Sequence, residues 1–133
     1  KAISETERRR KIQIEYNLKD TYLGIDSAIP CGLLVNELVS NALKHAFPGD
    51  REGKIYLSFL RLDDEAYQLI VRDDGIGIPE NINFDTTGTL GMHLIDMLAK
   101  QIEGNVLLER KDGSIFTVNF MGYESAKSKY PKG

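Results

Sequence analysis

Two hydrophobic periods alternate along this chain, and they predict strands in some segments and helices in others. Where apolar and polar residues alternate one by one, the pattern is typical of a strand with one buried face. Short polar runs at 63–65 and 111–114 separate two pairs of such segments and predict two hairpins. The segments predicted as strands are 11–18, which we expect to be half-buried, together with 22–25, 54–62, 66–72, 106–110 and 115–121.

Two other segments have apolar residues at helical spacing. The first is expected to begin at a capping Asp26 or Ser27, to tolerate Pro30 in its first turn and to end near 47–49. The second covers 91–102. The polar segment between Glu80 and Thr89 reads as a loop. The order of elements predicts an α/β fold with a mixed sheet, mostly antiparallel, and helices on one face in a two-layer sandwich.

The first helix also carries polar residues in an unusual place. At about 100° per residue, Asn41 and His45 fall on the border between its apolar and polar sides, where a helix that lines a site would present ligand-binding groups. The polar side holds Asn36, Glu37, Ser40 and Lys44. The apolar arc is formed by Leu34, Val35, Leu38, Val39, Ala42, Leu43 and Ala46.

Length and charge limit the function classes. The 133 residues fit one domain, which we place at 11–122, with a polar tail at 123–133. The net charge of −3 argues against a nucleic-acid partner. No apolar run approaches the ~20 residues that span a bilayer, and Cys31 has no partner for a disulfide. We therefore expect a soluble, cytoplasmic domain without membrane contact.

Three polar motifs lie in an order that suggests a nucleotide site. Each alone has an ordinary explanation: the helix as an amphipathic helix, Asp73-Asp74-Gly75 as a turn, and Gly88 to Gly91 as a helix start. Together they divide the work of holding a nucleotide. The amide oxygen of Asn41 suits Mg²⁺, which takes few protein ligands beside phosphates. Glu37 could orient a metal-bound water or act as a base, and the Lys44 ammonium offsets phosphate charge.

The second motif, which begins at Asp73, offers a mechanism for selecting adenine over guanine. Ionised Asp73 accepts a hydrogen bond from the exocyclic amine of adenine, whereas guanine presents a carbonyl there. Gly75 and Gly77 let the backbone turn tightly and a ring approach. The first amides of the helix after Gly91 form an anion site.

These motifs resemble the N box and the two glycine boxes of the GHKL ATPase superfamily. Residues 28–38 and 41–48 are most similar to the ATP-binding domain of sensor histidine kinases of the second HisKA type. The resemblance implies the Bergerat fold and a lid at 82–90. Ser114 stands at the usual Thr position, Asp74 stands where many relatives have Asn, and a Phe box is missing. The site residues that the resemblance implies are Glu37, Asn41, Lys44, His45, Asp73, Gly75, Gly77, Ile78, Thr89, Leu90, Gly91, Met92 and Ser114.

The resemblance implies that the chain binds ATP with Mg²⁺ and donates the γ-phosphate to a histidine. That acceptor lies on an upstream dimeric domain outside this chain, with a response regulator as an indirect partner, and residues 1–10 read as a remnant of the preceding segment. Glu37, Asn41 and Lys44 would be the catalytic residues, with Asn41 the metal ligand. Two alternatives stay open: a free-standing serine kinase of the anti-sigma-factor type, and a non-catalytic ATP-sensing docking module.

Overall fold

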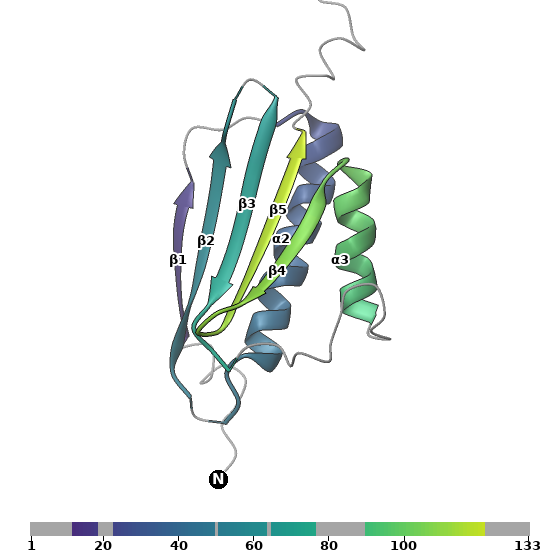
Figure 1. The fold of residues 1–133 in the computed structure, drawn as a ribbon. Helices are drawn as coiled ribbons and strands as arrows, with labels where there is room; N and C mark the ends of the chain where they lie inside the picture. The colour runs from purple at the N-terminus through teal and green to yellow at the C-terminus, as the bar shows by residue number, and fades with distance from the viewer. Residues whose placement is uncertain (1–11, 19–22, 50, 64, 77–89, 122–133) are drawn as a thin grey trace, which may run out of the picture.

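The computed structural model describes residues 12–18, 23–49, 51–63, 65–76 and 90–121, with only the backbone given for residues 90–92. These residues form a five-stranded sheet in the order β1-β2-β3-β5-β4 and two helices (Figure 1). The strands are β1 (Ile12–Leu18), β2 (Gly53–Arg61), β3 (Ala66–Asp73), β4 (Asn105–Arg110) and β5 (Ser114–Met121). The helices are α2 (Ile25–His45) and α3 (Leu90–Gln101).

The sheet is mixed, and both helices cover the same face of it (Figure 1). β1 runs parallel to β2, while the pairs β2–β3, β3–β5 and β4–β5 are antiparallel. A parallel pair needs a crossover connection, and here α2 provides it between β1 and β2. This arrangement confirms the predicted α/β sandwich with a mostly antiparallel sheet. Both predicted hairpins and both predicted helices are present. The hairpin strands and α3 differ from the prediction by at most one residue at each end, whereas α2 ends at His45 rather than near 47–49.

Two expectations about the start of α2 are wrong. The strand expected at 22–25 is absent where the chain is described, because Leu23 and Gly24 are not in a strand and Ile25 begins the helix. The N-cap is Gly24, and no side chain caps the helix. The Gly24 carbonyl instead accepts the amides of Ser27 and Ala28, at 3.0 and 2.9 Å. Ser27 cannot serve as the cap because it lies inside the first turn, fully buried.

A third expectation, that the first strand is half-buried, is also wrong. Ile12 is buried, but Ile14, Tyr16 and Leu18 are 47%, 71% and 57% exposed. Their alternation with polar residues is typical of a strand with one covered face. β1 lies at the edge of the sheet, however, beyond the area that α2 and α3 cover (Figure 1). The apolar row is therefore present in the sequence, but neither α2 nor α3 packs on it.

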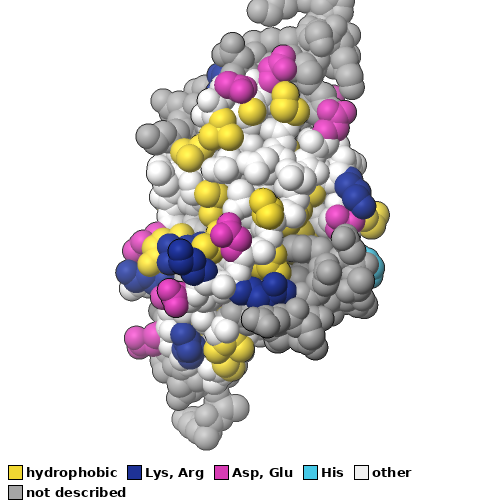
Figure 2. Space-filling model, viewed as in Figure 1, with side chains coloured by type: hydrophobic (Ala, Val, Ile, Leu, Met, Phe, Trp, Pro, Cys, Tyr) yellow, Lys and Arg dark blue, Asp and Glu magenta, His cyan; other side chains and the backbone are white. Residues whose placement is uncertain are grey.

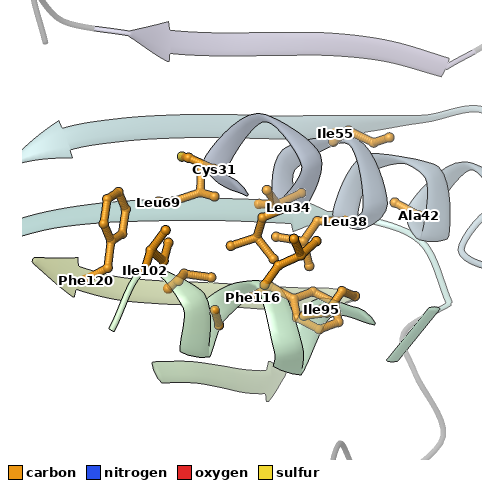
Figure 3. Close-up of a cluster of buried hydrophobic side chains, with 14 of the residues drawn as sticks. Cys31, Leu34, Leu38, Ala42, Ile55, Leu69, Ile95, Ile102, Phe116 and Phe120 are labelled. Atoms are coloured by element: carbon orange, nitrogen blue, oxygen red, sulfur yellow. The ribbon is translucent and has the colours of Figure 1, made fainter. Parts of the chain in front are cut away.

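The hydrophobic core fills the space between the sheet and the two helices (Figure 3). One stripe of α2 packs against the inward side chains of β2, β3 and β5, and α3 closes the other side. Burial of this apolar area is the main term that holds the two layers together. The labelled core residues are Cys31, Leu34, Leu38, Ala42, Ile55, Leu69, Ile95, Ile102, Phe116 and Phe120.

On the opposite face of the sheet, no helix of the described part of the chain is packed (Figure 1). Seen from that side, apolar side chains are scattered among uncharged ones, and most charged side chains lie towards the two ends and the margins of the face (Figure 2). Gln68 donates to Asn119 at 3.0 Å across β3 and β5 on this face. Among the residues described, neither helix is long and apolar enough to cross a membrane.

Candidate functional site

The helix and strand ends that carry the predicted site residues lie at one end of the sandwich. The C-terminal end of α2, the end of β3, the start of β5 and the start of α3 all reach the lower end in Figure 1. Their positions follow from the topology, since α2 and β3 run towards this end whereas β5 and α3 leave it. Residues that are far apart in sequence are thereby brought to the same edge of the sheet.

Asp73 is the buried carboxylate of this region. It is the last residue of β3, only 5% exposed, and it pairs with Ser114 across the strands β3 and β5. Its Oδ1 accepts the amide of Gly75 at 3.0 Å. Burial raises the pKa of Asp73, and the backbone hydrogen bonds from Gly75 and Ser114 oppose that shift. The arrangement holds an acceptor in a poorly solvated place, where a hydrogen bond from a ligand gains most.

Gly75 joins the end of β3 to the end of α2. The next residue, Ile76, donates its amide to the Ala46 carbonyl at 2.9 Å. A Cβ at Gly75 would overlap that carbonyl and lie 2.6 Å from the Ala46 Cβ. Sequence reasoning predicted this glycine as a place for a ring to approach. Among the described residues its close neighbour is α2, so Gly75 has a packing role whether or not a ring approaches.

Gly113 is a residue that sequence reasoning placed only in a turn. Its φ is +117°, which favours glycine, and a Cβ there would overlap the backbone carbonyl of Asp73. Gly113 therefore lets the turn between β4 and β5 press against the end of β3. The signal was present as Asp112-Gly113, which is typical of a tight turn, but the sequence does not show what the turn packs against.

The predicted residues of α2 lie along its last turns. Glu37, Asn41 and His45 follow one another at intervals of four residues, which places them on one stripe of the helix. Glu37 and Asn41 are half-buried, whereas Lys44 and His45 are exposed. This gradient agrees with a helix whose border, rather than its apolar side, faces a ligand. No group of three or more His, Cys, Asp or Glu residues that could hold a metal occurs among the described side chains.

The remaining predicted residues are described in part or not at all. Gly77, Ile78 and Thr89, and the lid expected at 82–90 apart from Leu90, fall outside the described residues. The first turn of α3 contains Leu90, Gly91 and Met92, of which only the backbone is described. The tail at 123–133 and the segment 1–10 also fall outside.

The comparison with protein families gives one long match. Residues 27–123 match the family described as histidine kinase-, DNA gyrase B-, and HSP90-like ATPase. This region contains both helices apart from the first residues of α2, and every strand except β1. Residues 1–22 also match Ultra-violet resistance protein B, and of these only 12–18 are described.

Similar proteins include histidine kinases and anti-sigma F factors. A blue-light-activated histidine kinase of Erythrobacter litoralis is 29% identical over 109 residues, which are 82% of this chain and 32% of that protein. The chain thus spans about a third of the length of this relative. Anti-sigma F factor of Bacillus licheniformis is 28% identical over 79 residues, 59% of this chain and 53% of its own length.

The solved structure of an Erythrobacter litoralis blue-light-activated histidine kinase has a similar fold. It superimposes with a TM-score of 0.80 and 26% identity, covering 92% of this chain and 40% of that one.

Proposed function

The chain belongs to the family of histidine kinase-, DNA gyrase B-, and HSP90-like ATPases, and on this premise we propose that it binds ATP with Mg²⁺ and donates the γ-phosphate to a histidine on a separate dimeric acceptor domain. The observation that carries the proposal is Asp73, a carboxylate held 5% exposed at the end of a strand. Burying a charge costs stability, so such a group is expected where it meets a ligand.

Adenine recognition is proposed for the end of β3. An ionised carboxylate can accept about four hydrogen bonds, so Asp73 keeps acceptor capacity beyond its bonds from the amides of Gly75 and Ser114, and the exocyclic amine of adenine would use it. Because guanine has a carbonyl at that place, the carboxylate would repel it. Ser114, opposite Asp73 on β5 and 1% exposed, would contribute its hydroxyl to the same side of the base.

Phosphate binding is proposed for α2 and the start of α3. The Asn41 amide oxygen would hold Mg²⁺, and half-burial next to half-buried Glu37 fits an ion that takes few protein ligands. When bound, Mg²⁺ would neutralise charge on the phosphates. Exposed Lys44 and His45 would contact the phosphates. The further proposed nucleotide contacts are Gly77, Ile78, Thr89, Leu90, Gly91 and Met92, of which the last three begin α3, where backbone amides favour anions.

The chemistry that these residues supply is positioning and charge stabilisation. Glu37 would orient a metal-bound water or act as a base, and Lys44 would stabilise charge on the transferring phosphoryl group. The acceptor histidine and any response regulator belong to this proposal as partners outside the chain. The match to anti-sigma F factors favours one alternative, a kinase that transfers phosphate to serine on a partner protein.

The test uses a matched pair of asparagines on α2. The chain is mixed with a dimeric histidine-kinase acceptor segment and radiolabelled ATP. Asn41→Ala should abolish Mg²⁺-dependent labelling, whereas Asn36→Ala, at an exposed position of the same helix, should leave it intact. Label on histidine supports the proposal. In a second reaction, the acceptor segment is replaced by the partner protein that an anti-sigma-factor kinase phosphorylates, and label on a serine of that partner supports the alternative. ATP binding without transfer to either would overturn both and favour an ATP-sensing module.

A further inference from the structure

The strand pair β2–β3 ends at the proposed adenine site in an irregular way. Ile55 and Asp73 form the last pair in the ladder. One residue further, the Asp74 amide donates to the Lys54 carbonyl at 3.2 Å, as a continuing ladder would. The return bond differs, because the Lys54 amide donates to the side-chain Oδ1 of Asp74 at 2.7 Å. The Asp74 carboxylate thus takes the place of a backbone acceptor.

This substitution leaves the backbone of residue 74 available for other bonds. The Asp74 carbonyl accepts from Arg51 Nη2 at 2.9 Å. Beyond it the chain turns towards α2, where Gly75 packs on Ala46. Room for the carboxylate depends on Gly53, since a Cβ there would lie 2.8 Å from the Asp74 Oδ1. Residues 51–54, which follow α2, therefore lie against Asp74, the residue next to Asp73.

We propose that Asp74 is a positioning residue for nucleotide binding, which fixes the Asp73 carboxylate towards the adenine amine through the Asp74 clip. The Asp74 clip is the set of three hydrogen bonds that join Asp74 to Arg51 and Lys54. It ties the end of β3 to the segment leaving α2, and thereby links the adenine side of the proposed site to the helix that carries the phosphate side. This inference rests on the proposed function.

The clip also places two opposite charges beside Asp73. The Asp74 carboxylate raises the pKa of Asp73 beyond the effect of burial, and the Arg51 guanidinium lowers it. The other groups that act on Asp73 are the amides of Gly75 and Ser114, which are uncharged. Removing one charge or the other should therefore move the titration of Asp73 in opposite directions.

Four other described titratable groups near this end of the molecule are exposed. Lys44 and His45 occupy the last turn of α2 and are exposed, as are Lys111 and Asp112 in the turn between β4 and β5. Solvent screens such groups, and their effect on phosphate binding is common to every nucleoside triphosphate.

The experiment measures the preference for the adenine amine against pH. Dissociation constants are determined by calorimetry for ATP and for purine riboside triphosphate, which lacks the 6-amino group. Protonation of the triphosphate and of exposed side chains affects both ligands equally, so it cancels in the ratio of the two dissociation constants. The preference should decline as Asp73 becomes protonated, and the midpoint of that decline is the readout.

Three variants test the clip. Asp74→Asn keeps an acceptor for the Lys54 amide, so the preference at neutral pH should stay within about twofold while the midpoint moves to lower pH. Arg51→Gln should move the midpoint to higher pH. Asp74→Ala removes the acceptor and should lower the preference by about 3- to 10-fold, the equivalent of one net hydrogen bond.

The matched control is Asp63, which accepts two backbone amides at the other end of the same hairpin. Asp63→Ala should leave both preference and midpoint unchanged. If Asp74→Ala lowers the melting temperature but changes neither readout, Asp74 is structural only and the inference is overturned. If the unaltered chain binds both triphosphates equally, the adenine contact itself fails, and with it the proposed function.

Discussion

The two ends of the β2–β3 hairpin use the same hydrogen bond in different surroundings. At the turn, Asp63 Oδ1 accepts the amide of Glu65 at 2.9 Å, and at the open end Asp73 Oδ1 accepts the amide of Gly75 at 3.0 Å. The bonds to Glu65 and Ala66 lower the pKa of Asp63, which is exposed. Burial raises the pKa of Asp73 in spite of its bonds. The degree of solvation, and not the hydrogen bond, therefore decides whether the pKa is raised or lowered.

The comparison separates a carboxylate that shapes a turn from one that costs stability. Asp63 is ordinary turn chemistry, in which a short acidic side chain satisfies the amides that follow it. Asp73 satisfies one amide in the same way but gives up most of its water. A ligand that donates a hydrogen bond to Asp73 would replace the hydrogen bonds from water that burial removes, which agrees with the proposed adenine contact.

The largest expected effect is on nucleotide affinity. Asp73→Asn should weaken ATP binding by tenfold or more, because it removes a charge-assisted hydrogen bond of about 1.5 to 3 kcal/mol. Asp63→Asn makes the same chemical change at the other end of the hairpin and should leave affinity unchanged. Calorimetric titration of both variants measures the difference. Equal affinities in the two variants would remove the adenine assignment from Asp73.

The next effect concerns the residue two positions after each aspartate. Gly75→Ala should destabilise the fold by about 1 to 3 kcal/mol, as overpacking does, because the new Cβ would overlap the Ala46 carbonyl. Glu65→Ala, at the exposed equivalent position, should leave the unfolding midpoint in urea unchanged. A Gly75→Ala protein as stable as the unaltered chain would show that the end of α2 yields easily at this contact.

The sequence was informative where local pattern and tertiary position agree. Alternation placed Asp73 correctly at a strand end and Asp63 in a turn. Helical spacing placed Asn41 and His45 on the border of α2, where Asn41 is half-buried but His45 is exposed. Gly24 was missed as the cap because any residue can supply the carbonyl that begins a helix. The exposure of β1 depends on which strands the helices cover, and that is set by packing.

The contacts at the site were harder to predict for the same reason. Gly75 was recognised from its motif, but its contact with Ala46 joins segments that only the fold brings together. Arg51 gave no signal in the sequence, since a single basic residue in a loop has no periodicity. Its bond to the Asp74 carbonyl depends on a side chain taking the last place in the β2–β3 ladder.

The smallest effect, and the one that tests the comparison most directly, is the pH dependence of stability without nucleotide. A lowered pKa gives Asp63 a stabilising contribution that is present above its ordinary 3.8 and is lost as pH falls through the folded value. The raised pKa of Asp73 acts in the opposite sense, since stability falls as pH rises from 3.8 through the folded value.

The two asparagine variants should therefore change the stability profile in opposite directions. Asp73→Asn keeps an acceptor for the Gly75 amide and loses the buried charge, so the nucleotide-free protein should become more stable at neutral pH. Asp63→Asn should become less stable there, and the difference from the unaltered chain should vanish in acid. Urea unfolding across this pH range measures both. If Asp73→Asn is less stable at neutral pH, the charge is compensated within the fold, and a ligand is no longer needed to explain why a carboxylate is buried at the end of β3.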